Sequence, residues 1–257
     1  MKITFPPILP LKRDLADYQR HYLEVPYEYQ QVQFRKRKIK EILSKYPHHQ
    51  LLEIGCGLDA IFLDISSYSQ LTVLEPCSIF YNKANADIAK AKNKNIRIIN
   101  SLLEESLDQL AKMNFDFILV SSLLHEIPHP EKFLSSLFQI SGDKTVIHIN
   151  VPNGKSFHRL LGLEMGLINS EYQKSEYNIK FQQNTVFGLE SLIEITEYSG
   201  FKVIESGSYA FKPFTHLQMQ KMMDAGIMTP EMLDGFYNME KHLPGMGSEI
   251  FVNVSKA

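Results

Sequence analysis

The sequence predicts an α/β protein with a Rossmann-like, mostly parallel open sheet and helices on both faces. From residue 51 onward, short apolar runs alternate with segments of helical period, which is typical of βαβ units. The runs are mostly apolar, as in strands that are covered on both faces. The 257 residues suffice for one large domain, or for one domain with a modest appendage.

Seven strands are expected. Five are the buried runs Leu51–Ile54, Leu71–Leu74, Ile96–Ile99, Phe115–Val120 and Thr145–Ile149, and two later ones are Lys202–Glu205 and Glu249–Val254. Because crossovers between parallel strands are right-handed, few topologies remain open for such a sheet.

Helices are expected between the strands, where apolar residues recur three and four positions apart. These stripes are Leu58, Ile61, Phe62 and Ile65; Phe80, Ala84, Ile88 and Ala91; and Phe133, Leu134, Leu137 and Phe138. Residues 156–168 are also expected to be helical, whereas 169–187 are polar and irregular. A further helix around residues 189–196 ends at Gly200 in the manner of a C-cap.

Residues 1–50 are predicted to be an N-terminal helical lid segment ahead of the main domain at 51–257. Two features of this segment have two interpretations each. The basic run of Arg35, Lys36, Arg37, Lys38 and Lys40 is either a solvated helix face or a phosphate-binding patch. The aromatic rings of Tyr18, Tyr22, Tyr27 and Tyr29 either cover a cationic ligand or pack on the sheet edge.

Composition excludes several classes of protein. Lys and Arg total 27 against 29 Asp and Glu, so the chain offers no general field for nucleic acid. Two cysteines support neither a disulfide framework nor a cysteine-rich zinc site. No apolar run is long enough for a membrane span, and the first residues lack the features of a signal peptide. A cytoplasmic location is therefore expected.

Two insertions, at about 152–187 and 208–247, are expected to form the pocket for a second substrate. Seven of the ten methionines lie within the second insertion, between positions 219 and 246. Methionine fills gaps in cores and also lines adaptable surfaces, so both packing and a pocket wall remain open for this group.

The sharpest motif is the turn after the first expected strand, which contains Gly55 and Gly57. Glycines there allow a tight turn and bring backbone amides close to a ligand. With Ala60 at the position of the third glycine, the motif also satisfies the dinucleotide-binding fingerprint. Glu75 lies twenty residues past Gly55, where a carboxylate would accept hydrogen bonds from ribose hydroxyls. NAD and S-adenosylmethionine (SAM) share these features.

Two details favour SAM over NAD. Glu53 is a charged residue at the end of an apolar strand, and a buried carboxylate is costly unless it is paired. A sulfonium and an ammonium would supply that pairing. Polar residues also follow the fourth expected strand from Ser121 onward, at the crevice where open α/β sheets bind ligands.

Over about residues 50–257 the sequence resembles the class I SAM-dependent methyltransferases. Glu53-Ile54-Gly55-Cys56-Gly57 is similar to their first motif, with Asp59 where a third glycine is often found, and Leu74-Glu75-Pro76 is similar to the second. Asn100-Ser101-Leu102 falls where the family contacts adenine, and Phe115–Ser121 resembles the fourth-strand motif of the family. Leu124–Pro130 resembles the motif that follows this strand, with the order of His and Glu exchanged.

The resemblance implies a seven-stranded sheet in the order 3-2-1-4-5-7-6 with the last strand antiparallel, and SAM as cofactor with S-adenosylhomocysteine (SAH) as product. The cofactor-binding residues that it implies are Glu53, Gly55, Cys56, Gly57, Glu75, Pro76, Ser101, Leu102 and Ser121. Residues 150–168 also resemble a bacterial branch associated with surface polysaccharides or other small metabolites. This favours a sugar-like or nucleotide-sugar acceptor.

A hydroxyl acceptor must lose a proton during methyl transfer, for which histidine is the usual agent. His125, directly after the fourth expected strand, is the candidate base, and Glu126 could orient it; the alternatives are a loop histidine and an acid favoured near a helix N-terminus. His158 and Arg159 could bind an anionic substrate group. His148 is expected in the core and His129 on the surface.

The predicted function is methyl transfer from SAM to the oxygen or nitrogen of a small molecule. The alternatives are a non-catalytic SAM-binding module that serves a partner protein, a nucleic-acid methyltransferase and an NAD-dependent oxidoreductase. Prolines 128 and 130 argue against a helical metal site at His125 and His129, so no metal is expected. A homodimer is as compatible with the sequence as a monomer.

Overall fold

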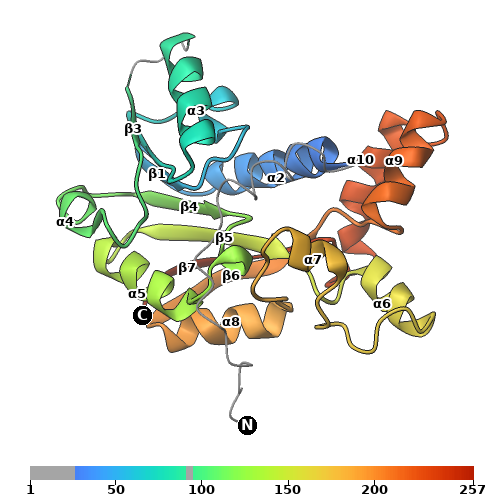
Figure 1. Ribbon diagram of the computed structural model, residues 1–257. Coiled ribbons are helices and arrows are strands. Elements are labelled where there is room, and N and C mark those ends of the chain that lie inside the picture. The colour runs from blue at the N-terminus through green and yellow to red at the C-terminus, as the bar shows by residue number, and fades with distance from the viewer. Residues whose placement is uncertain (1–26, 91–94) are drawn as a thin grey trace.

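The computed structural model describes residues 27–90 and 95–257, which form one seven-stranded sheet (Figure 1). The strands are β1 Gln50–Ile54, β2 Gln70–Leu74, β3 Ile96–Ile99, β4 Phe117–Ser121, β5 Val146–Pro152, β6 Phe201–Tyr209 and β7 Glu249–Lys256. All seven expected strands are therefore present, and β6 continues four residues past the expected Glu205.

The strand order is β3-β2-β1-β4-β5-β7-β6. The first five strands pair in parallel, whereas β7 lies antiparallel between β5 and β6. This confirms the topology that the resemblance implies. The carboxyl ends of β1, β2 and β4 consequently meet at one edge, where ligands bind in open sheets of this kind.

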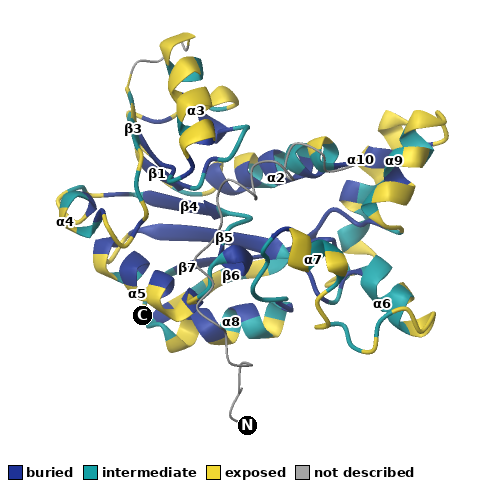
Figure 2. Ribbon diagram, viewed as in Figure 1, coloured by how far each residue is buried: buried dark blue, intermediate teal, exposed yellow. Residues whose placement is uncertain are grey.

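Residues of the central strands alternate between two cores. Leu51 and Phe117 pack with the apolar face of α2 (Glu28–Leu43), while Leu52 and Ile118 pack with α5 (Pro130–Ile140) and α8 (Leu189–Tyr198). Figure 2 shows β4 and β5 buried between these layers. The remaining helices of the two layers are α3 (Ser78–Lys90) and α4 (Leu107–Leu110).

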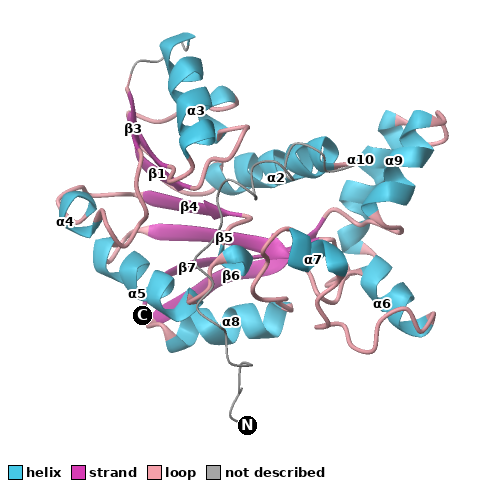
Figure 3. Cartoon of the chain, viewed as in Figure 1, coloured by secondary structure: helices cyan, strands magenta, loops and turns pink. Residues whose placement is uncertain are grey.

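Four more helices, found in the two insertions, gather beyond one end of the sheet (Figures 1 and 3). They are α6 (Phe157–Glu164), α7 (Glu176–Lys180), α9 (His216–Asp224) and α10 (Pro230–Asn238). Residues 169–187 are thus mostly irregular, as expected, apart from the short α7. No helix within residues 27–90 and 95–257 is long and apolar enough to cross a membrane.

The helix expected from the stripe at Leu58–Ile65 is wrong. Only a 3-10 turn, η1 (Ile61–Leu63), forms between β1 and β2. Gly57 lies in the left-handed region at φ 56°, and the Ile61 amide donates to the Glu53 carboxylate instead of to a helix carbonyl. The apolar side chains of the segment still enter the core, which explains the misleading pattern.

The basic run on α2 is neither a solvated face nor an open phosphate patch. Arg35 and Lys36 are buried on the side of the helix that faces the sheet. Lys36 bonds to Asp59 and Asp64, and Arg37 and Lys38 pair with acids on the molecule's surface. The interpretation as a solvated face fails because Arg35, Lys36 and Arg37 find acidic partners outside the helix. Lys38 pairs with Glu41 of the helix itself.

Four of the seven methionines of the second insertion serve in packing, whereas Met232 is exposed. Met219 and Met228 are buried in the same core as α2, with Met222 and Met223 packed against it. Of the tyrosines considered as a lid, Tyr27 is buried in that core, whereas Tyr29 is 74% exposed. Tyr18 and Tyr22 lie outside the described residues.

Candidate active site

A cavity of about 660 Å³ lies at the carboxyl ends of β1, β2 and β4. One part of its wall comes from the loops that follow these strands. The other comes from α2, α6, α7 and the start of α9. A volume of this size is typical of sites for small molecules and cofactors.

The turn after β1 has the geometry that its two glycines make possible. Gly55 and Gly57 lie at φ 75° and 56°, a region that other residues rarely adopt. A Cβ atom on Gly55 would lie 3.2 Å from a methyl carbon of Leu123. The backbone can therefore approach a ligand closely here, and both glycines line the cavity.

The Glu75 carboxylate connects the ends of β1 and β2. Its Oε2 accepts a hydrogen bond from the Gly57 amide at 3.1 Å, and its Oε1 accepts one from the Cys77 amide at 2.8 Å. The Asn100 side chain donates to the Glu75 carbonyl at 2.8 Å. The acid predicted to bind ribose is thus buried and fixed beside the glycine turn.

Glu53 is a second buried acid at the same end of the cavity. Its two oxygens accept from the Ile61 amide at 3.1 and 3.3 Å. Burial raises the pKa of Glu53 to about 8, and neither that hydrogen bond nor the Lys36 charge offsets the effect. Within residues 27–90 and 95–257, no cation lies in ion-pair contact with this carboxyl.

The other residues that the sequence predicts for the cofactor come together at this end. Cys56, Pro76, Ser101, Leu102 and Ser121 all line the cavity. Burial raises the pKa of the Cys56 thiol, so this cysteine is a packing group rather than a nucleophile.

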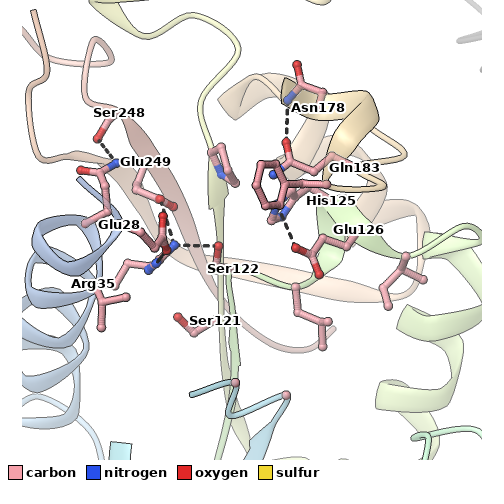
Figure 4. Close-up of a pocket in the computed structure, with 18 of the residues that line it drawn as sticks. Glu28, Arg35, Ser121, Ser122, His125, Glu126, Asn178, Gln183, Ser248 and Glu249 are labelled. Atoms are coloured by element: carbon pink, nitrogen blue, oxygen red, sulfur yellow. Dashed lines mark hydrogen bonds and ion pairs between the residues drawn. The ribbon is translucent and has the colours of Figure 1, made fainter. Parts of the chain in front are cut away.

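His125 and Glu126 belong to a 3-10 turn, η2 (Leu124–Glu126), directly after β4. Both side chains are buried and line the cavity, and His125 Nε2 lies 3.9 Å from Glu126 Oε1 (Figure 4). The His125 carbonyl accepts from the amides of Asn184 and Thr185. The turn is thereby tied to the segment after α7.

Opposite this turn lies a buried ion cluster that the sequence does not predict. Arg35 pairs with Glu28, lies 3.6 Å from Glu249 and donates to the Ser122 hydroxyl at 2.9 Å (Figure 4). Ser122 has a φ of 51°, and such strained positions are typical of functional sites. Asn150 also donates to Glu249, at 3.3 Å.

His158 and Arg159 both line the cavity but differ in what they can do there. The Arg159 guanidinium donates to the backbone carbonyls of Gly154, Glu171 and Gln173, at 2.6–3.2 Å. It therefore braces the irregular segment. His158 Nδ1 lies 3.1 Å from the Ser156 hydroxyl, and no hydrogen bond joins its Nε2 to another residue of the described part of the chain.

Two further basic groups at this end were missed by the sequence analysis. Lys212, between β6 and α9, is 2% exposed, and its Nζ lies 3.2 Å from Nε2 of His216, the first residue of α9. The Tyr177 ring stacks on His216 with 5.5 Å between centroids. A lysine within the apolar run at 209–214 is the one available signal.

The two remaining histidines of interest lie where the sequence predicts. His148 is buried within β5 and bonds to Asn253 at 2.7 Å; burial lowers its pKa to about 4. His129 is exposed. Neither lines the cavity.

Comparison with known proteins identifies the family. A family model described as a methyltransferase domain matches residues 26–206, which is most of the chain. No curated protein matches by sequence.

Solved structures share the fold at low sequence identity. A SAM-dependent methyltransferase from Thermotoga maritima, described as a possible histamine N-methyltransferase, has a TM-score of 0.61 at 15% identity over 95% of this chain and 99% of its own. The plantazolicin methyltransferase BamL, solved with a substrate analogue and SAH, has a TM-score of 0.56 at 15% identity over 94% and 96%. The cyclopropane synthase MmaA2 from Mycobacterium tuberculosis has a TM-score of 0.57 at 16% identity over 96% and 100%.

The cavity fits the cofactor of this family. The glycine turn, the buried Glu75 and the buried Glu53, which the sequence predicts to bind it, all line this one cavity. The chain belongs to the methyltransferase-domain family and has the class I fold, with SAM as its cofactor.

Proposed function

We propose that the protein is an enzyme that transfers a methyl group from SAM to a small-molecule acceptor held in the same cavity. One observation supports this most strongly. A single cavity is lined by the cofactor residues Gly55 and Glu75 and also by His158, Tyr177 and His216 from the two insertions. Cofactor and acceptor would therefore share one enclosed space.

SAM supplies an electrophilic methyl group on a sulfonium. The chain's own contribution is to position two molecules and exclude water, which in favourable cases is worth roughly 7–11 kcal/mol. The loops after β1 and β2 orient the cofactor, while α2 and the helices of the insertions enclose the acceptor. The lid role predicted for residues 1–50 remains a proposal, supported by the α2 residues Gln31 and Arg35 in the cavity wall.

For a hydroxyl acceptor, His125 takes the proton and Glu126 orients its ring. The location supports this assignment, because η2 follows β4 directly at the sheet edge where the cofactor loops meet. The separation of 3.9 Å between His125 Nε2 and Glu126 Oε1 exceeds a hydrogen bond. Catalytic contacts of this kind often tighten only when substrate is bound.

Isothermal calorimetry of the purified protein with SAH, and with NADH as control ligand, tests the cofactor site. We expect SAH to bind and NADH not to bind. Binding of NADH alone would contradict the proposal. Next, the protein is incubated with SAM and a panel of hydroxyl and amine acceptors, beginning with nucleotide sugars, and products are detected by mass spectrometry as a gain of one methyl group.

Formation of a methylated product by the wild type and not by a Glu75→Gln variant would support the enzyme. SAH binding without methylation of any acceptor, together with a co-purifying protein, would instead support the non-catalytic module.

A further inference from the structure

Three basic side chains at the acceptor end of the cavity, Lys212, His216 and His158, form what we call the basic cluster. Lys212 and His216 are within hydrogen-bond distance at 3.2 Å. Lys212 is also close enough to His158 to affect its protonation. The three groups come from the β6–α9 connection, α9 and α6, and all line the cavity.

The other cations in the described cavity wall are already satisfied. Arg35 contacts Glu28 and Glu249, Lys36 contacts Asp59 and Asp64, and Arg159 donates to three backbone carbonyls. Lys212 differs from them, because no carboxylate within residues 27–90 and 95–257 lies in ion-pair distance of its Nζ.

Two acids act on Lys212 from further away. Glu249 and Glu28 both favour its charged form, but both are engaged by Arg35. Asn150 occupies the second oxygen of Glu249. The protein therefore places a buried lysine near two acids that already pair with Arg35.

Burial disfavours the protonated, positively charged forms of the three side chains in the basic cluster when the cavity holds no anion. It lowers the pKa of Lys212 to about 7. The pKa values of His158 and His216 are lowered well below the ordinary value, first by burial and then by the neighbouring Lys212 charge. Removing a cation from water without a counter-ion in contact is costly, and an incoming anion would supply that counter-ion.

We infer that the basic cluster binds an anionic group of the methyl acceptor, a carboxylate or a phosphate, so that the substrate class is an anionic small molecule. This inference rests on the proposed function. Charge-assisted hydrogen bonds from several nitrogens to one anion are strong. His158 Nε2 and the Lys212 ammonium have such bonds to give, and the Tyr177 stack holds the His216 ring in place.

A single general base at Lys212 is the competing explanation. It involves Lys212 alone, whereas the charge of Lys212 also lowers the pKa values of His158 and His216. A bound anion would offset the effect of the Lys212 charge on both histidines, and a lone proton transfer would not. The arrangement therefore favours anion binding.

The test follows the ring protons of the histidines by NMR as a function of pH, in protein saturated with SAH. Inorganic phosphate and acetate are added in separate arms, which distinguish the two kinds of anion. We expect the pKa values of His216 and His158 to rise by about one unit or more in at least one arm. The exposed His129 is a control in the same spectra. No rise in either arm, or an equal rise at His129, would overturn the inference.

Variants show whether Lys212 carries the effect. Lys212→Met keeps the length of the side chain and removes the charge, with exposed Lys241→Met as the matched control. We expect Lys212→Met to weaken binding of the active anion by about tenfold or more, with SAH affinity unchanged. An anion affinity equal to that of Lys241→Met would refute the assignment. His216→Gln gives a second measure if Lys212→Met does not fold.

The two proposals fail in different ways. If the wild type does not bind SAH, the proposed function is wrong. If SAH binds but neither phosphate nor acetate shifts the histidines, only the anion subsite is wrong. Turnover of an amino or hydroxy carboxylate, or of a phosphate ester, but not of its uncharged amide or dephosphorylated counterpart would confirm the substrate class.

Discussion

The two ends of the cavity have opposite chemical character. The cofactor end, at the tips of β1 and β2, presents the buried acids Glu53 and Glu75. The acceptor end, between α6 and α9, presents the buried Lys212 and the half-buried His216. Burial raises the pKa of Glu53 and lowers that of Lys212.

This difference shows how one cavity can sort two ligands. Glu53 at one end and Lys212 at the other have no opposite charge in ion-pair contact within residues 27–90 and 95–257, so each favours a ligand that supplies it. A cationic cofactor suits the acidic end, and an anionic acceptor suits the basic end. The five predictions below test whether the ends act separately.

The largest effect on activity is expected for a change at His125. His125→Asn removes the proposed base, and general bases contribute about 100- to 10,000-fold. With a hydroxyl acceptor we expect a loss in kcat of that size in steady-state kinetics, with SAH affinity preserved. His129→Asn is the matched control. Full activity of His125→Asn would exclude this residue as the base.

At the cofactor end, Glu75→Gln is expected to weaken SAH binding by about 10- to 100-fold, the range for a hydrogen bond to a charged group. A glutamine offers one acceptor oxygen, so it cannot serve both the Gly57 and Cys77 amides as the carboxylate does. Calorimetry measures the change, and Glu131→Gln on the exposed side of α5 is the control. Unchanged affinity would contradict the ribose contact.

At the acceptor end, Arg159→Met should lower the free energy of unfolding by about 2–3 kcal/mol, because backbone carbonyls lose a charged donor. Urea denaturation measures this, with exposed Arg97→Met as control. We expect SAH affinity to remain unchanged. A loss of SAH affinity in the folded variant would show that the two ends are not separate.

The smallest expected effect is the release of a proton when SAH binds. Glu53 has a pKa of about 8, so it holds its proton near pH 7, and a cationic ligand group favours the ionised form. Binding of SAH, through its ammonium, should therefore release up to one proton, and affinity should rise with pH between about 6 and 8. Calorimetry in buffers of different ionisation enthalpy measures the release, and Glu53→Gln should abolish it.

Binding of acetate to the basic cluster should be accompanied by proton uptake rather than proton release. Lys212 and the histidines gain protons when an anion binds, so acetate affinity should fall as pH rises through about 7. Proton release at both ends would contradict the contrast between them.

The cofactor end could be predicted from the sequence because its residues follow strands. Glu53, Gly55 and Glu75 lie at the ends of β1 and β2, and parallel strands bring their carboxyl ends to one edge. The helix expected after Gly57 was wrong, because buried apolar residues in a loop can mimic a helical period.

The acceptor end could not be predicted in the same way. Lys212 and His158 are 54 positions apart by their residue numbers, and Arg35 meets Ser122 and Glu249 from distant parts of the chain. No local pattern marks such pairs. The basic run containing Arg35 has the appearance of a solvated helix face until its partners are known.

The sequence by itself determined the sheet, its strands, the glycine turn and the acid beside it, because strand burial and backbone turns depend on residues close together in the chain. Only the tertiary structure decided which charges are paired and which are left for a ligand. Pairing depends on the distance between groups in space and on their burial. That Lys212 has no carboxylate in contact among the described residues is evident only once the nearby acids are seen to pair with Arg35.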